Sequence, residues 1–118
     1  MKILIIEDRK DLLYALTTIL TVEGYEVETA ETFLTGKLLI SKNKYDLVIA
    51  DLLLPAWAEL ELAEAINNNI HQLNIPVIVI TETEDSMFDN TFGFAEICLT
   101  KPLNKKLLML AIKSVLRN

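Results

Sequence analysis

The sequence predicts an α/β fold in which a five-stranded parallel sheet carries helices on both faces. Five short apolar runs rich in Val, Ile and Leu punctuate the chain. Segments with apolar residues at helical spacing separate these runs, so strand and helix alternate five times. The chain has 118 residues, the length of one domain, and we expect that domain to span residues 1–118.

The five apolar runs differ in their pattern. Four of them are nearly continuous, which is typical of strands covered on both faces. The run at 25–30 instead alternates apolar and acidic residues, as in an edge strand whose charges discourage pairing with another sheet. We therefore expect strands at residues 3–6, 25–30, 47–50, 76–80 and 95–99.

Helical patterns fill the segments between the strands. Leu12, Leu16 and Leu20 repeat at helical spacing and predict the first helix, and Gly24 follows as its stop signal. Further helices are expected at residues 32–42 and 59–69, and a short acidic one at 84–92.

The last helix has the clearest pattern and is expected at residues 103–116. Lys105, Lys106 and Lys113 lie outside a single apolar stripe, which should face the sheet. The stripe consists of Leu103, Leu107, Leu108, Ala111, Ile112, Val115 and Leu116.

Composition excludes several classes of protein. With 11 Lys and Arg against 17 Asp and Glu, the net charge is −6, which disfavours direct binding to nucleic acid. A single cysteine, Cys98, rules out an internal disulfide and a cysteine-based zinc site. No apolar run approaches the roughly 20 residues that span a bilayer, and the start does not have the pattern of a signal peptide. We expect a cytoplasmic protein that does not contact a membrane.

Polar residues gather where the expected strands end. Glu7 and Asp8 end the first strand, Asp51 the third and Thr81 the fourth, and Lys101 follows the fifth. Ligands of such sheets bind at the carboxyl ends of the strands. Three neighbouring carboxylates need a proton, a lysine or a cation, and oxygen ligands suit Mg²⁺. The set invites a phosphoryl group, and a carboxylate can itself be the nucleophile that forms an aspartyl phosphate.

In these residues the chain resembles the response regulator receiver domain of two-component signalling. The resemblance covers essentially the whole chain. It implies a flavodoxin-like (βα)5 three-layer sandwich with sheet order 2-1-3-4-5. The segments that carry it are 5–8 (IIED), 46–55 (DLVIADLLLP), 75–81 (IPVIVIT) and 99–103 (LTKPL).

The resemblance also implies a phosphoacceptor and a metal site. Asp51 would take a phosphoryl group from a histidine kinase or a histidine phosphotransfer protein. Asp8 and Asp51 would bind Mg²⁺ together with the backbone carbonyl of Leu53, and Glu7 would act largely through water. The domain would turn over no external substrate, so we do not expect an enzyme.

Two further residues would read the phosphoryl group. Thr81 would bond one of its oxygens and shift on activation, and Lys101 would pair with another. The peptide bond from Lys101 to Pro102 is often cis in this family. The fourth helix, fifth strand and fifth helix would form the output surface, which contacts a downstream protein or an output domain.

Three positions depart from the family pattern and leave alternatives open. Glu82 follows Thr81 where a small residue is usual, Glu59 replaces a glycine, and Cys98 replaces the switch aromatic residue. A degenerate receiver that acts as a phosphorylation-independent interaction module is the main alternative. A Mg²⁺-dependent phosphatase fits less well, because no second acid lies two residues after Asp51. Dimerisation through the output surface also stays open.

Overall fold

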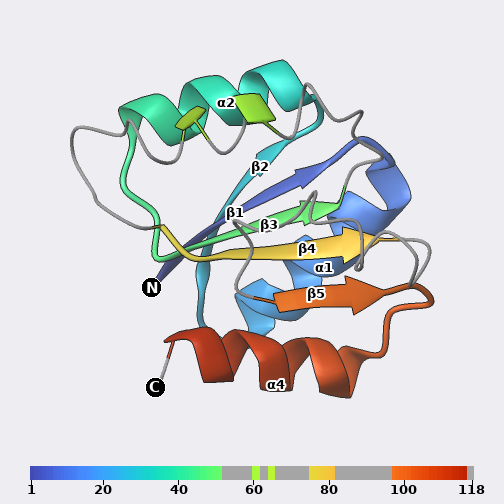
Figure 1. The fold of residues 1–118 in the computed structure, drawn as a ribbon. Helices are drawn as coiled ribbons and strands as arrows, with labels where there is room; N and C mark the ends of the chain where they lie inside the picture. Colours follow the sequence, from blue (N-terminus) through green and yellow to red (C-terminus); the bar gives the residue numbers. More distant parts are fainter. Residues whose placement is uncertain (52–59, 62–63, 66–74, 82–96, 117–118) are drawn as a thin grey trace.

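The computed structural model describes residues 1–51, 60–61, 64–65, 75–81 and 97–116. Five parallel strands form one sheet in the order β2-β1-β3-β4-β5 (Figure 1). The prediction of a parallel sheet in the order 2-1-3-4-5 is confirmed. The strands are β1 (Lys2–Glu7), β2 (Glu26–Ala30), β3 (Leu47–Asp51), β4 (Val77–Thr81) and β5 (Ile97–Thr100).

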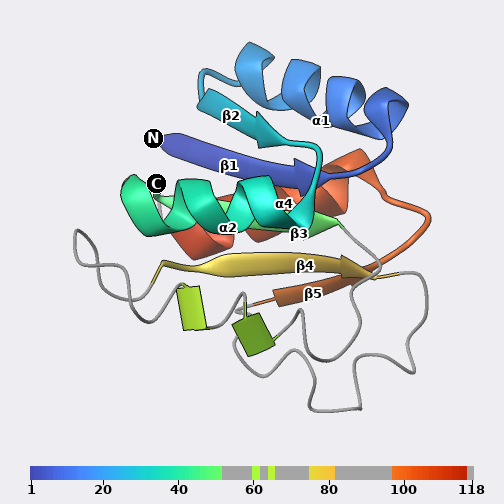
Figure 2. The same ribbon diagram turned by 90° about the horizontal axis from the view of Figure 1, so that it is seen from above.

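Helices cover both faces of the sheet, so the molecule has three layers. The helices are α1 (Lys10–Val22), α2 (Phe33–Lys42) and α4 (Lys105–Leu116). Figures 1 and 2 show α2 on one face and α1 with α4 on the other. Successive strand residues point to opposite faces. In β1, Ile3 and Ile5 therefore pack with α1 and α4, whereas Leu4 and Ile6 pack on the side of α2.

Two expected helices fall largely outside the described residues. Residues 60–61 and 64–65 are helical, in agreement with the helix expected at 59–69. The rest of that segment and the whole of 84–92 lie outside the described ranges. None of the helices that the structure describes is long and apolar enough to cross a bilayer.

The first helix ends at Val22, and Gly24 follows as the stop signal that the sequence predicts. This glycine has a φ of 94°, a backbone conformation that favours glycine. Its N–H bonds to the carbonyl of Thr21 at 3.0 Å, and the N–H of Tyr25 bonds to that of Leu20 at 3.1 Å. This pair of bonds is the Schellman arrangement, which satisfies the last carbonyls of α1 and turns the chain into β2.

The expected apolar stripe of the last helix is partly wrong. Leu107 is exposed, and Met109 instead contributes to the core beside Leu108 and Ile112. Asn104 caps the helix, because its Oδ1 accepts the N–H groups of Lys106 and Leu107 at 2.8 and 3.2 Å. Successive residues of a helix point about 100° apart. Because Leu108 and Ile112 face the sheet, the side chain of Leu107 points away from it.

A polar cluster of Lys2, Glu28 and Tyr45 ties the edge strand β2 to neighbouring segments. Lys2 Nζ lies 3.0 Å from Glu28 Oε2, and the buried Tyr45 donates its hydroxyl to the other Glu28 oxygen. The bond from Tyr45, together with Lys2, holds the pKa of Glu28 below its ordinary value. The predicted edge strand is confirmed, and its charges tie it to β1 and to the start of β3.

Replacing Gly36 with Ala is expected to destabilise the chain by about 1–3 kcal/mol. An added Cβ would lie 2.6 Å from Cδ1 and 2.9 Å from Cγ1 of Ile6, which is fully buried. This overpacking outweighs the gain of about 1 kcal/mol in helix propensity. Urea unfolding measures the change. Ile6→Val removes Cδ1, so the double variant should lose less than the two single losses added; a Gly36→Ala chain more stable than the parent contradicts the prediction.

Candidate functional site

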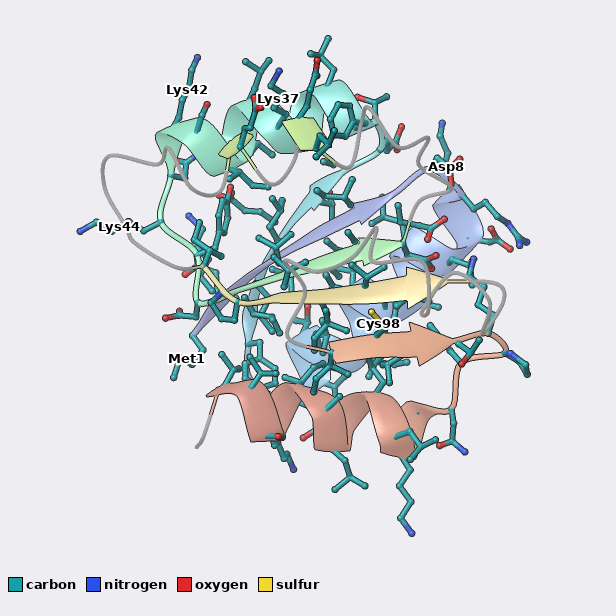
Figure 3. All side chains as sticks on the ribbon, viewed as in Figure 1. Met1, Asp8, Lys37, Lys42, Lys44 and Cys98 are labelled. Carbon is teal, nitrogen blue, oxygen red and sulfur yellow. The ribbon has the colours of Figure 1, made fainter. Side chains whose placement is uncertain are left out.

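The carboxyl ends of four strands meet at one edge of the sheet, as predicted. Glu7 and Asp51 are register partners at the ends of β1 and β3. Thr81 ends β4 beside the end of β5, and Lys101 follows β5 directly. Asp8 lies at the end of β1 and is exposed (Figure 3). The parallel topology therefore places all five sequence-predicted residues at this edge.

Several predicted features lie outside what the structure describes. These are the side chain of Thr81, the backbone carbonyl of Leu53, and the departures at Glu59 and Glu82. The third departure, Cys98, is described: its half-buried thiol packs against the core on the α2 side of the sheet. Burial raises the pKa of this thiol.

Asp51 and Lys101 form an ion pair at the centre of the site. Lys101 Nζ lies 3.0 Å from Asp51 Oδ1. Asp51 is buried, and Lys101 remains partly exposed, so the ammonium reaches a buried carboxylate from the rim of the sheet. The Lys101–Pro102 peptide bond is cis, as the resemblance implies.

Glu7 lies beside Asp51 as a second buried acid. The two residues are only 1% and 2% exposed. Oε1 of Glu7 accepts the backbone N–H of Arg9 at 2.9 Å. Burial, followed by the proximity of the Asp51 carboxyl, raises the pKa of Glu7 to about 8. Near neutral pH and without a cation, this pair therefore holds a proton that two separate carboxyls would have lost.

One oxygen of each buried acid accepts no hydrogen bond from the part of the chain that the structure describes. Among the described residues, Glu7 Oε2 and Asp51 Oδ2 are buried and lack a hydrogen-bond partner. Buried polar atoms are rarely left in this state, because the lost solvation is costly. A shared proton would satisfy both oxygens, and so would a cation that Asp51 binds directly and Glu7 binds through water. The donor set thus fits a hard cation that takes oxygen ligands.

The number of acids fits Mg²⁺ in particular. In the part of the chain that the structure describes, no three His, Cys, Asp or Glu side chains are grouped closely enough to hold a metal ion by themselves. Mg²⁺ commonly keeps several waters and uses only one or two carboxylates. The pair at this edge therefore suits an ion that completes its shell with water.

The sequence did not reveal the anchor of Glu7. Its donor is a backbone N–H, and Arg9 occupies the N-cap position of α1, where such a group is free. The N-cap position of the helix, two residues after Glu7, is the signal that indicates this bond. The bond fixes Oε1, and Oε2 is the oxygen of Glu7 to which none of the described residues donates.

The model of the response regulator receiver domain matches residues 3–113. The chain belongs to this family. It is similar to the protein PilH of Pseudomonas aeruginosa, with 31% identity over 98% of this chain and 97% of that protein. The CpxR homolog of Haemophilus influenzae, a transcriptional regulatory protein, is 32% identical. That match covers 98% of this chain but only 50% of the relative, so this chain spans about half the length of that protein.

Solved structures agree with this assignment. The response regulator TrrA of Thermotoga maritima, solved with Mg²⁺-BeF, superposes with a TM-score of 0.82 at 27% identity. That match covers 97% of both chains. A CheY-like receiver domain from Methanospirillum hungatei gives 0.82 at 28% identity, over 98% of this chain and 93% of that one. This receiver thus has the three-layer fold of two-component response regulators.

Proposed function

We propose that this receiver accepts a phosphoryl group on Asp51 and passes the signal through its output surface. The observation that carries the proposal is the state of Asp51: Oδ1 pairs with Lys101, while the buried Oδ2 has no hydrogen-bond partner among the residues that the structure describes. A carboxylate with one oxygen neutralised and the other free is oriented for nucleophilic attack. The donor would be a histidine kinase or a histidine phosphotransfer protein.

Transfer of the phosphoryl group to Asp51 mainly requires that the phosphohistidine and the carboxylate are correctly positioned. Oδ2 of Asp51 attacks phosphorus, the new O–P bond forms as the P–N bond of the phosphohistidine breaks, and the electron pair leaves with the imidazole. The Lys101 ammonium, already at the site, neutralises one phosphoryl oxygen, and Thr81 donates a hydrogen bond to another. Both contacts favour the phosphorylated state and bias the conformational equilibrium of the output surface.

Mg²⁺ is the cofactor that we assign to this site. Asp8, Asp51 and the carbonyl of Leu53 would hold it, with Glu7 acting through water. When bound, it neutralises charge on the transferring group. The related TrrA was solved with Mg²⁺-BeF, which supports Mg²⁺ binding by receivers in general. We place the domain in the cytoplasm as a module that acts on itself, without turnover of an external substrate.

The interaction-module alternative rests on the departures from the family pattern. The one that the structure describes, Cys98, packs without a ring that could swing during switching. That observation concerns how a signal leaves the site, whereas the Asp51–Lys101 pair concerns how it enters. The phosphoacceptor function is therefore the one that the geometry supports best.

Incubation with acetyl phosphate and Mg²⁺ is expected to add the mass of one phosphoryl group, in a bond that is stable to acid and labile to base. Asp51→Asn should abolish the gain, because the amide is not a nucleophile at this position. Intact-protein mass spectrometry is the measurement, and Asp11→Asn, which changes an exposed acid of α1, is the matched control.

Two results contradict the phosphoacceptor function. If the mass gain persists in Asp51→Asn, another side chain is the acceptor. If no gain is seen in the parent chain, the interaction-module alternative takes its place. Sustained turnover of a phosphomonoester would instead favour the phosphatase.

A further inference from the structure

The outer side of α2 carries a continuous apolar strip. Leu34 and Leu38 are 64% and 49% exposed, and their spacing of four residues places them next to each other on one side of the helix. Gly36 and Ile40 are buried on the opposite side, where Gly36 lies against Ile6 of the sheet. The two leucines therefore lie outside the core and leave apolar surface in contact with water. We call them the α2 strip.

The hydroxyl groups around the α2 strip already take part in hydrogen bonds. Thr32 caps the helix, because its Oγ1 accepts the N–H of Thr35 at 3.1 Å, and its hydroxyl donates to Thr35 Oγ1 at 2.9 Å. Ser41 donates its hydroxyl to the carbonyl of Leu38 at 2.8 Å. Covering the strip therefore does not bury these groups without a hydrogen bond. A capped helix is also preorganised, so little conformational freedom is lost when a partner binds it.

Charges of both signs are balanced around the α2 strip. Lys37 Nζ lies 3.2 Å from Glu61 Oε2, and Figures 1 and 2 show the helical residues 60–61 and 64–65 on the same side of the sheet as α2. Three lysines and three glutamates lie on α2 or on the segments next to it: Lys37, Lys42, Lys44, Glu31, Glu61 and Glu64. Glu59 is the only further Asp, Glu, Lys or Arg of residues 52–74. This surface is thus close to neutral on a domain with a net charge of −6, so the repulsion between two acidic copies is weakened here.

The charges are also ordered along the helix. Glu31 is exposed just before α2, and Lys42 is exposed in its last turn, where Figure 3 shows it extending away from the sheet. Two such helices can lie antiparallel about a two-fold axis that passes between Leu34 and Leu38. Leu34 of each copy then meets Leu38 of the other, and Lys42 of each copy comes close to Glu31 of the other. Because opposite charges meet at both ends, the surface is complementary to itself.

We propose that α2 is the contact surface of a weak symmetric dimer of this chain. The α2 strips of two copies pack against each other, and two Lys42–Glu31 pairs flank them. The helix has 10 residues and is about 15 Å long, so the contact is at the small end of specific interfaces. We expect a dissociation constant between about 10 µM and about 1 mM. The inference goes beyond the proposed function, because it uses no residue of the Asp51 site.

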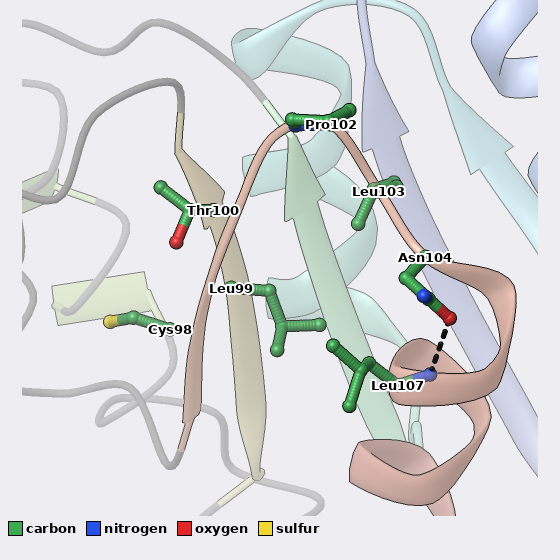
Figure 4. A pocket seen from close by; sticks show the side chains of 7 residues that line it. All are labelled: Cys98, Leu99, Thr100, Pro102, Leu103, Asn104 and Leu107. Carbon is green, nitrogen blue, oxygen red and sulfur yellow. Dashed lines mark hydrogen bonds between the residues drawn. The ribbon is translucent and has the colours of Figure 1, made fainter.

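This contact leaves β5 and α4 uncovered. α4 lies on the other face of the sheet, and β5 is the edge strand at the opposite end from β2 (Figure 2). A pocket of about 150 Å³ is lined there by residues that include Cys98, Thr100 and Leu107 (Figure 4). A dimer formed through β5 and α4 would cover this pocket, whereas a dimer formed through α2 would not. The accessibility of Cys98 therefore distinguishes the two arrangements.

Sedimentation equilibrium of the complete unphosphorylated chain, at concentrations from about 10 µM to about 1 mM, measures the association. Leu34→Gln/Leu38→Gln should weaken it about tenfold or more, because glutamine keeps the helix propensity and removes the apolar contact. Leu107→Gln/Leu110→Gln changes two exposed leucines of α4 and is the matched control, which should alter the dissociation constant less than about twofold. Circular dichroism confirms that each variant is folded.

A charge exchange tests the antiparallel order without changing the leucines. Lys42→Glu and Glu31→Lys should each weaken the dimer about tenfold, because like charges then meet at both ends. The double variant, and a mixture of the two single variants, should each recover the parent dissociation constant within about threefold, because opposite charges meet again. Lys113→Glu makes the same change in net charge as Lys42→Glu at an exposed site of α4 and should have little effect.

The thiol of Cys98 gives a second readout. It is the only cysteine of the chain, so a thiol reagent reports the pocket beside β5 alone. With the reagent in excess, its rate of reaction should be the same below and above the dissociation constant of the dimer. Failure to phosphorylate Asp51 leaves these results unchanged, and failure to dimerise leaves the phosphorylation assay unchanged.

Five results overturn the proposal. The chain stays monomeric up to about 1 mM, beyond the range expected for even a weak specific contact. The association is insensitive to Leu34→Gln/Leu38→Gln. The charge exchange weakens the dimer but its combinations do not restore it. Species larger than a dimer grow with concentration, which indicates a head-to-tail contact between two different surfaces. Cys98 reacts more slowly in the concentrated chain, which gives the contact to β5 and α4.

Discussion

Lys101→Met is expected to lower the free energy of unfolding by about 2–4 kcal/mol near pH 8 in buffer without divalent cations. The substitution keeps the length of the side chain but removes the ammonium that pairs with Asp51, a carboxylate buried next to a second acid. Breaking one side of a buried pair leaves an uncompensated charge, and that cost exceeds the net value of the pair. Urea unfolding measures the loss.

The pH dependence separates this explanation from a packing defect. Near pH 5 the folded chain holds the proton of Glu7, so the buried acid beside Asp51 is neutral and the variant should regain part of its lost stability relative to the parent chain. Lys113→Met, which changes an exposed lysine of α4, is the control and should stay within about 0.5 kcal/mol of the parent chain. A loss that is equal at both pH values would show that Lys101 acts through packing rather than charge.

The same substitution should also slow phosphorylation by acetyl phosphate. In the unphosphorylated chain Lys101 pairs with Asp51, and after transfer it would pair with a phosphoryl oxygen. Under the proposed function, one residue would therefore stabilise both the resting carboxylate and the phosphorylated product. The stability loss and the rate loss should both appear in Lys101→Met and neither in Lys113→Met.

The sequence predicted the topology of the site well because the site depends on strand ends. Asp51 follows an uninterrupted apolar run, and so does Glu7, so a parallel sheet must bring the two residues to one edge. The same logic placed Lys101 there. The number of strands could be predicted because each apolar run is short and is separated from the next by a helical segment. The order of the strands came from the resemblance to the receiver family.

The sequence did not predict how deeply Glu7 is buried. Alternation along β1 determines which face a side chain points to, but the bond from the Arg9 N–H to Oε1 depends on the exact start of α1. The exposure of Leu107 was missed for a similar reason, because it depends on how α4 is rotated against the sheet. The cluster of Lys2, Glu28 and Tyr45 joins three separate segments, and no local pattern marks it.

Glu7 is expected to make the chain less stable as pH rises from about 5 to about 8 in the absence of divalent cations. Its pKa is about 8 in the folded chain against an ordinary value of 4.5. Between these values the folded state holds more protons than the unfolded state, so the free energy of unfolding falls with pH. One proton gives a slope of at most about 1.4 kcal/mol per pH unit. Urea titrations at a series of pH values measure this slope.

Glu7→Gln should remove the slope and leave a chain that is more stable than the parent near pH 8. The amide cannot ionise, and its N–H₂ group can donate to Asp51 Oδ2, which has no hydrogen-bond partner within the described ranges. Glu28→Gln is the matched control: the pKa of Glu28 is lowered, so its contribution to stability is lost only as the pH falls into the acidic range, and the slope between about pH 5 and 8 should persist. A parent chain whose stability is flat or rises over this window contradicts the raised pKa of Glu7.

The effect of Mg²⁺ on stability shows whether the Glu7–Asp51 pair binds a cation or only shares a proton. If Asp51 binds the cation directly and Glu7 binds it through water, as proposed, Mg²⁺ should stabilise the parent chain most near pH 8, where it competes with fewer protons, and less near pH 5. Asp51→Asn should lose most of this stabilisation, because the amide brings no charge to the ion. If instead Mg²⁺ stabilises equally at both pH values, it binds elsewhere, and the carboxyl groups of Glu7 and Asp51 share only a proton.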